Sequence, residues 1–143
     1  MNTPLITVPV SYRLREYLSS CIDFAPYAVA ARQQHDALHS TAKHAPAPAS
    51  LPQRMAIVAF ATPAFFYKVA RVGSCTFQFT SSGLARQSKL GTLEVAWCEI
   101  KRVYRLSQVY LFAKEKGAMP LPYRCLSVSA RAELESLLSA NGL

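Results

Sequence analysis

The chain has little charge and few acidic residues. Only 17% of its 143 residues are charged, against 51% that are hydrophobic, and Lys and Arg outnumber Asp and Glu by 16 to 8. The net charge of +8 suits an anionic partner: a membrane surface, a nucleic acid or an acidic protein. Residues 1–67 carry +2 of it and residues 68–143 carry +6. A chain of this length is expected to form one core with an appendage.

Cysteine and glycine are too sparse and too scattered to form the common cofactor motifs. The five glycines form no Gly-rich phosphate loop. Structural zinc needs close pairs of ligands, and no two cysteines stand at that spacing, so no metal site and no cofactor are expected. The cysteines instead fit small core residues of a protein in a reducing compartment. They are Cys21, Cys75, Cys98 and Cys125.

Histidine occurs in one short stretch, as His35, His39 and His44. The first two are four residues apart, but Asp36 is the one nearby ligand type and would face away from them. We therefore expect exposed histidines, which lie beside a flexible linker and are poorly placed to activate a cysteine nucleophile.

Acidic residues give no acid–base pair either. Glu94 and Glu99 stand close to Lys101 and Arg102, so solvated ion pairs are expected there. The sequence predicts no catalytic residues and no enzyme activity.

The N-terminal region begins with an extended segment and a helix. The first ten residues lack a basic n-region and are interrupted by Pro4 and Pro9, so no signal peptide is predicted. Residues 5–10 read as an edge strand at best, because proline cannot donate a hydrogen bond. After Ser11, a plausible N-cap, the pattern changes to an amphipathic helix that Pro26 either ends or kinks. Its apolar stripe is Leu14, Tyr17, Leu18, Cys21 and Ile22.

An Ala/Pro linker over residues 43–52 precedes an apolar segment. The 13 residues from Met55 to Tyr67 carry no charge, whereas about 20 are needed to span a bilayer. Three interpretations stay open: a short or tilted membrane segment extended by snorkelling Lys68 and Arg71, an interfacial helix lying on the bilayer, and a helix buried against the rest of the chain.

From residue 75 onward the pattern is that of strands. Cys75, Phe77 and Phe79 alternate with polar residues, and Gly83 is expected to supply a turn with positive φ. Further strands are predicted over 84–90, 93–97, 103–106, 109–113 and 118–121, with a short helical turn after Trp97. A final helix is expected to begin at Ser127 or Ser129 and to end at Asn141-Gly142. Its apolar stripe is Leu134, Leu137 and Leu138.

This order predicts an α+β fold: a small antiparallel sheet or barrel, capped by a C-terminal helix and preceded by N-terminal helices. Residues 1–72 are expected to form the N-terminal region and residues 73–143 the sheet domain. Trp97 falls in line with Leu93 and Val95, and is predicted to be a core residue at the junction of two strands.

Residues 73–140 resemble the C-terminal domain of the YcxB-like family, a bacterial module with a pleckstrin-homology-like (PH-like) fold. The residues that carry the resemblance are Phe77 and Phe79 before Ser82-Gly83, Trp97 with Ile100 and Val103, Tyr110-Leu111-Phe112, Met119-Pro120 and the Leu-rich final helix. The resemblance implies a seven-stranded PH-like sheet fold capped by a helix, no enzyme activity, and two membrane-spanning segments near the N-terminus. A linker and one short apolar segment stand in place of that membrane hairpin here.

Basic residues on neighbouring strands and turns form the candidate site. In a PH-like fold they could share a rim that meets anionic headgroups, each contributing about 1 kcal/mol, or they could simply be a solvated surface. They are Arg86, Lys89, Lys101, Arg102, Arg105, Lys114 and Lys116. RNA binding would need exposed aromatic residues on the sheet, and core packing explains Tyr104, Tyr110 and Tyr123 equally well.

Two functions follow as expectations. One is a non-catalytic binding module, a PH-like domain at the cytoplasmic face of a bacterial inner membrane, where Lys68 and Arg71 would lie if the apolar segment inserts. The other is a soluble, immunity-type cytoplasmic protein that binds and neutralises a cognate toxin through acidic groups on its partner.

Overall fold

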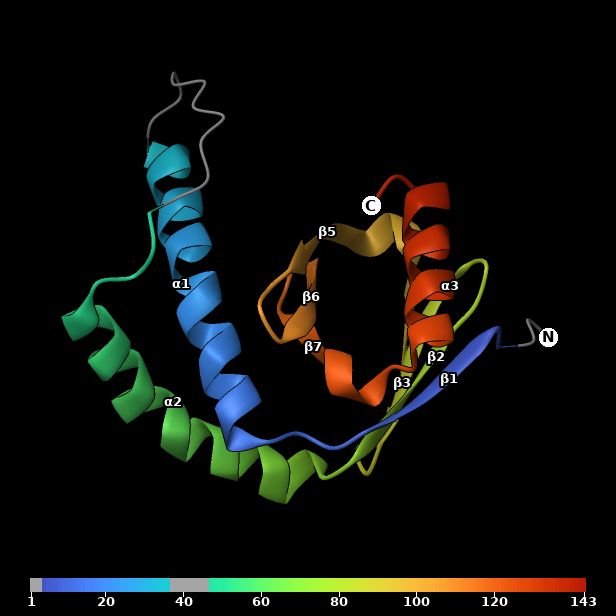
Figure 1. Ribbon diagram of the computed structural model, residues 1–143, viewed down its shortest axis with the longest axis horizontal. Coiled ribbons are helices and arrows are strands. Elements are labelled where there is room, and N and C mark those ends of the chain that lie inside the picture. The colour runs from blue at the N-terminus through green and yellow to red at the C-terminus, as the bar shows by residue number, and fades with distance from the viewer. Residues whose placement is uncertain (1–3, 37–46) are drawn as a thin grey trace.

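The described residues form an α+β structure of two antiparallel sheets and three α-helices (Figure 1). The computed structural model describes residues 4–36 and 47–143, with backbone only for residues 31–36. His39 and His44 lie outside the described residues, as does the side chain of His35.

The first sheet has the strand order β1-β2-β3-β4 and the second has the order β5-β6-β7. The strands of the first are β1 (Ile6–Val10), β2 (Cys75–Phe79), β3 (Gly83–Ser88) and β4 (Gly91–Ala96). Those of the second are β5 (Ile100–Arg105), β6 (Val109–Lys114) and β7 (Ala118–Pro122). The helices are α1 (Leu14–Asp36), α2 (Leu51–Val72) and α3 (Val128–Ala140), with 3-10 turns η1 (Trp97–Glu99) and η2 (Tyr123–Cys125).

The main core lies between the two sheets and α3. Alternating residues of β2 and β1 are buried on its inner side, among them Phe77, Phe79 and Val8. The second sheet supplies Val103, Tyr110 and Phe112, and α3 closes the open side with Leu134 and Leu138, both with no exposed surface. These three faces bury each other, which confirms the predicted sheet with a C-terminal helical cap.

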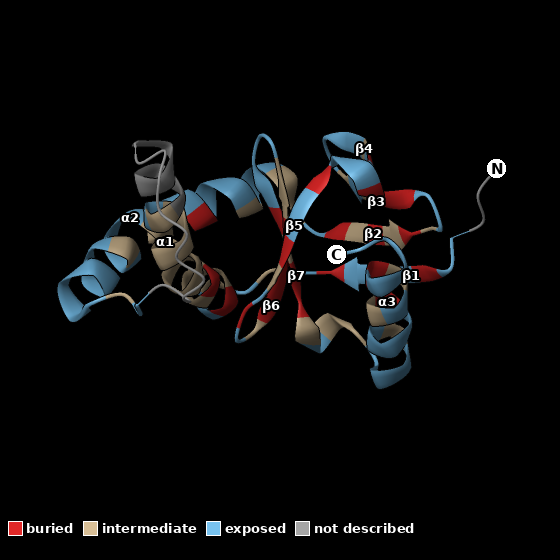
Figure 2. Ribbon diagram, turned by 90° about the horizontal axis from the view of Figure 1, so that it is seen from above, coloured by how far each residue is buried: buried red, intermediate tan, exposed pale blue. Residues whose placement is uncertain are grey.

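The second sheet has protein on both of its faces. Seen from above, β5–β7 lie between the helices α1 and α2 and the first sheet (Figure 2). One face belongs to the main core, and the other forms a smaller cluster in which Leu106, Val109 and Leu111 pack with Phe24 and Tyr27 of α1. Four successive residues of β6 are therefore buried, as expected of its central position.

The chain passes from the first sheet to the second at Trp97, between β4 and β5. Its ring stacks on Phe79 with centroids 6.4 Å apart, and its indole N–H donates to the carbonyl of Thr80 over 3.1 Å. The helical turn predicted after Trp97 covers η1 only, because β5 begins at Ile100. Glu99 caps η1 by accepting from the amide of Ala96, rather than forming the predicted surface ion pair.

Three other expectations need correction. Gly83 does not have positive φ; it is required because a Cβ there would lie 2.2 Å from the carbonyl oxygen of Val95. Pro26 does not end α1, which continues to Asp36. A boundary at residue 73 also separates β1 from its own sheet, because β1 pairs with β2 along its whole length. β1 is, as predicted, an edge strand.

The C-terminal cap provides a test of this core. Leu138→Ala removes a fully buried side chain and should lower the free energy of unfolding by about 2–5 kcal/mol. Leu90→Ala makes the same change at a side chain that is 62% exposed, and it should cost under about 0.5 kcal/mol. Urea unfolding followed by circular dichroism measures both. Equal losses for the two variants would contradict the position assigned to α3.

Candidate functional site

The first half of α1 is fixed to the second sheet by polar contacts. The carboxylate of Glu16, only 7% exposed, accepts from the guanidinium of Arg124 in η2, and a second hydrogen bond of the pair measures 3.1 Å. Two turns further on, Asp23 accepts from the backbone amide of Ser107 over 3.3 Å. Arg124 also donates to the carbonyl of Ser11, just before the helix. These contacts set the direction in which α1 leaves the sheets.

Helix α2 packs against α1 through a single stripe. Phe65 is the one buried residue of α2, and its ring lies 5.4 Å from that of Tyr17 in α1. Lys68, one turn later, places its ammonium 5.3 Å from the centroid of the same Tyr17 ring. Ile57, Ala61 and Val69 share this side at four-residue spacing and are half-buried.

The opposite side of α2 is apolar and exposed, and we call it the outer face of α2. Phe60 is 80% exposed, and Phe66 and Tyr67 are 59% and 64% exposed. Arg71 lies at the C-terminal end of this face and donates to the hydroxyl of Tyr67 over 3.2 Å. In Figure 2 nearly the whole of α2 has the colour of exposed residues. The interpretation of this segment as a buried helix is therefore wrong.

Length and composition single out the same helix. Among the described residues, α2 alone is long and apolar enough to cross a membrane. It is longer than the charge-free segment, since it begins at Leu51, directly after the Ser50 cap, and runs to Val72.

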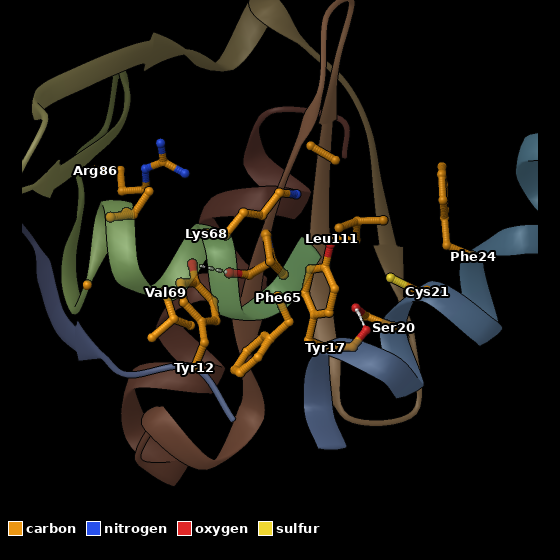
Figure 3. A pocket seen from close by; sticks show the side chains of 14 residues that line it. Tyr12, Tyr17, Ser20, Cys21, Phe24, Phe65, Lys68, Val69, Arg86 and Leu111 are labelled. Atoms are coloured by element: carbon orange, nitrogen blue, oxygen red, sulfur yellow. Dashed lines mark hydrogen bonds between the residues drawn. The ribbon is translucent and has the colours of Figure 1, made fainter. Parts of the chain in front are cut away.

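A cavity of about 430 Å³ lies where the helices meet the sheets (Figure 3). We call it the junction cavity. One wall comes from the first turns of α1 and another from the last two turns of α2, while the strands supply the remainder. Its lining includes Tyr12, Tyr17, Phe65, Lys68, Arg86 and Leu111.

Tyr12 forms the polar edge of the junction cavity. Its hydroxyl donates to the carbonyl of Pro120 over 2.9 Å and accepts from the thiol of Cys75 over 3.6 Å. Burial raises the pKa of the Tyr12 hydroxyl far above its usual value, and burial also raises the pKa of the Cys75 thiol. Both groups are therefore neutral at physiological pH.

Arg86 extends into the junction cavity from the core-facing side of β3. It stands two residues after Leu84, which is 2% exposed, and its strand neighbours are Phe77 and Leu93. Its Nε is buried and has no hydrogen-bond partner among the described residues. The alternation along β3 places Arg86 on the inner side with Leu84, so this orientation could have been found from the sequence.

The structure does not gather the seven predicted basic residues into one rim. Arg105 is held by Glu135 of α3 through a hydrogen bond of 2.8 Å, and that guanidinium lowers the pKa of Glu135. Arg86 lines the junction cavity, and Lys89 lies near Gly73 at the end of α2. The four that share one end of the second sheet, where β5 begins and β6 ends, are Lys101, Arg102, Lys114 and Lys116.

The aromatic residues considered for RNA stacking serve the core and the α1 contact. Tyr110 has no exposed surface, and its hydroxyl donates to Glu135 over 2.6 Å. Tyr104 lies against Phe24 and Tyr27 of α1, with ring centroids 5.2 Å and 5.0 Å away. Among the described residues, no three His, Cys, Asp or Glu side chains are grouped closely enough to hold a metal ion.

Comparison with protein-family models, curated proteins and solved structures found no match to the chain. The functional argument therefore depends on the outer face of α2 and the junction cavity.

The Glu16–Arg124 contact can be tested by removing its charge. Glu16→Gln should lower the free energy of unfolding by about 1–3 kcal/mol, because a largely buried charged hydrogen bond is lost. Glu133→Gln, the same change at an exposed position on α3, should have little effect. Hydrogen exchange of the amides of α1 should rise in the first variant alone. Unchanged exchange there would show that the ion pair does not hold α1.

The four cysteines are free in the structure, and their exposure predicts their reactivity. Cys98 is exposed, contrary to its expected place in the core, whereas Cys75 is buried and has a raised pKa. A thiol reagent should therefore modify Cys98 first, and Cys98→Ser should remove the fast phase. Cys75 should react only after unfolding. Rapid modification of Cys75 in the folded protein would contradict its burial.

Proposed function

We propose that the protein is a non-catalytic binding module that docks on an anionic membrane surface through the outer face of α2. The observation that carries the proposal is an apolar helix packed on one side only, with Phe60, Phe66 and Tyr67 exposed on the other. Exposed apolar faces of this kind mark membrane or protein contacts, and aromatic residues suit the bilayer interface.

The surroundings of α2 favour a helix lying in the plane of the interface over one that spans the bilayer. Its inner stripe is covered by α1, whose Glu16 and Asp23 are bonded to the second sheet. Surrounding α2 with lipid would bring these polar groups toward the hydrocarbon, where they are costly. Lying flat, α2 inserts its outer face and keeps α1 on the aqueous side.

Positive charge at both ends of the helix supports an anionic surface. Arg54 precedes the charge-free segment, and Lys68 and Arg71 follow it. Of these, Arg71 borders the outer face, and a basic residue near an anionic bilayer contributes about 1 kcal/mol, whereas Lys68 faces the junction cavity. In a bacterial cell, basic flanks of this kind favour the cytoplasmic face.

The arrangement of strands also agrees with the resemblance to the YcxB-like family. Four antiparallel strands, three more, and a closing helix form the α+β core. Six of the seven described strands, β2 to β7, and the closing helix α3 lie in the residues that carry the resemblance, and β1 adds a seventh strand from outside them. On the proposed function, α1 and α2 take the place of that family's membrane hairpin as a surface anchor.

The immunity-type alternative rests on the net charge and stays a prediction. It would make the outer face of α2 a contact for an acidic protein rather than for lipid.

Vesicle flotation tests the membrane contact. The protein should float with vesicles of phosphatidylglycerol and phosphatidylethanolamine, and Phe60→Ser should weaken partitioning about tenfold or more, since one buried Phe side chain is worth about 1.5–3 kcal/mol. Val128→Ser is the matched control, because Val128 is 90% exposed on α3.

Two results would overturn the proposal. One is wild-type protein that stays wholly unbound with these vesicles. The other is equal partitioning of Phe60→Ser and Val128→Ser, which would show that the outer face of α2 is not the contact.

A further inference from the structure

Arg86 is half-buried at a core-facing position of β3, where the alternation of the strand predicts an apolar side chain. Along β3 it faces the same way as Leu84, and across the sheet it neighbours Phe77, which has no exposed surface. A guanidinium at such a position normally has a carboxylate beside it, because an unpaired charge away from water is costly.

No carboxylate of the described residues lines the junction cavity. Tyr12 and Cys75, which lie near enough to Arg86 to feel its charge, are neutral, and the buried Nε of Arg86 has no hydrogen-bond partner among the described residues. Lys68 adds a second cation from α2. The cavity thus holds two positive groups and an unused donor, which an anion would satisfy.

The remaining walls of the junction cavity are apolar. Phe65 and Leu111 are 6% and 7% exposed, and Val69, Val72 and Phe24 complete this part of the lining. Figure 3 labels Phe24, Phe65, Val69 and Leu111 around the cavity, together with Arg86, which belongs to β3. A volume of about 430 Å³ falls within the usual range for sites of small ligands.

We propose that the junction cavity binds a single-chain amphiphile with an anionic headgroup. Arg86 and Lys68 contact a carboxylate or phosphate head, and the acyl chain lies between Phe65 and Leu111. This chemistry has two sources, a free fatty acid and a lysophospholipid taken from a bilayer. The proposal goes beyond membrane docking and does not depend on it, because the cavity lies on the side of α2 opposite the outer face.

Isothermal titration calorimetry with soluble probes tests the proposal. Dodecanoate and dodecyl phosphate, each below its critical micelle concentration, should bind saturably to the full chain, whereas dodecanol should bind more weakly. Tighter binding of dodecanoate assigns a fatty acid, and tighter binding of dodecyl phosphate assigns a lysophospholipid-type head. Either result supports the site.

Matched variants locate the binding. Arg86→Gln should weaken dodecanoate binding about tenfold or more, the usual effect of losing a charge-assisted hydrogen bond. Lys116→Gln makes the same charge change in the exposed β6–β7 hairpin and should leave the affinity unchanged. Ala118→Phe, at an exposed position of the cavity lining, should reduce binding by occupying space, and it covers the case in which Arg86→Gln fails to fold.

Equal binding of dodecanol and dodecanoate, or equal affinities of all three variants, would overturn the proposal. Phe60→Ser should keep full affinity for dodecanoate, since Phe60 does not line the cavity. A protein that binds dodecanoate but not vesicles would therefore refute the docking function alone, and one that binds vesicles but not dodecanoate would refute this site alone.

Discussion

The contact between Glu16 and Arg124 is the constraint on which the helical part of the molecule depends. It joins the first turn of α1 to η2, and the largely buried carboxylate of Glu16 needs the guanidinium of Arg124, which itself remains partly exposed to water. The hydrogen bond from Arg124 to Ser11 fixes the chain just before the helix as well. Helix α2 has no comparable contact with the sheets among those described, and it takes its place by packing on α1 through Phe65 and Lys68.

Two residues, one on α2 and one on β3, depart from the ordinary pattern of burial. Phe60 is apolar and exposed, whereas Arg86 is charged and turned toward the core side of its sheet. The main core follows the expected pattern, with Phe77, Tyr110 and Leu134 fully buried. Natural sequences tend to break local rules where function requires it, and both proposed binding features stand where this chain breaks them. The outer face of α2 and the junction cavity lie on opposite sides of one helix.

Local sequence patterns predicted the parts of the fold that depend on neighbours in the chain. The alternation through Phe77 and Phe79 gave a strand, and the spacing of Leu134 and Leu138 gave the closing helix. Long-range pairing was not accessible in this way: nothing near Ile6 indicates that its partner is Phe79. The partner of Glu16 is 108 residues away in η2, so that ion pair was missed for the same reason.

The candidate site was predicted less well than the fold. The distribution of basic residues along the sequence identified Arg86 but grouped it with surface residues such as Lys116. The number of basic residues does not show which face of the sheet each side chain occupies. The alternation of residues along β3 indicates that Arg86 faces the same side of the sheet as the buried Leu84. The sequence does not decide whether α2 is buried or exposed, because the composition of Met55–Tyr67 is the same whether this segment faces protein, lipid or water. The packing of α1 shows which side of the helix faces protein and which side the described residues leave uncovered.

The pairing of β1 with β2 has a consequence for how the protein folds. Val10 stands opposite Cys75, so the 64 residues between them leave the sheet and return to adjacent positions. Closing a loop of that length costs roughly 4 kcal/mol in chain entropy, whereas β2–β3, β3–β4, β5–β6 and β6–β7 close through short turns. The difference in chain separation therefore predicts that β1 pairs after the other strands. Prior packing of α1 on α2 brings the two ends together, so the helices that form the proposed binding features also assist completion of the sheet.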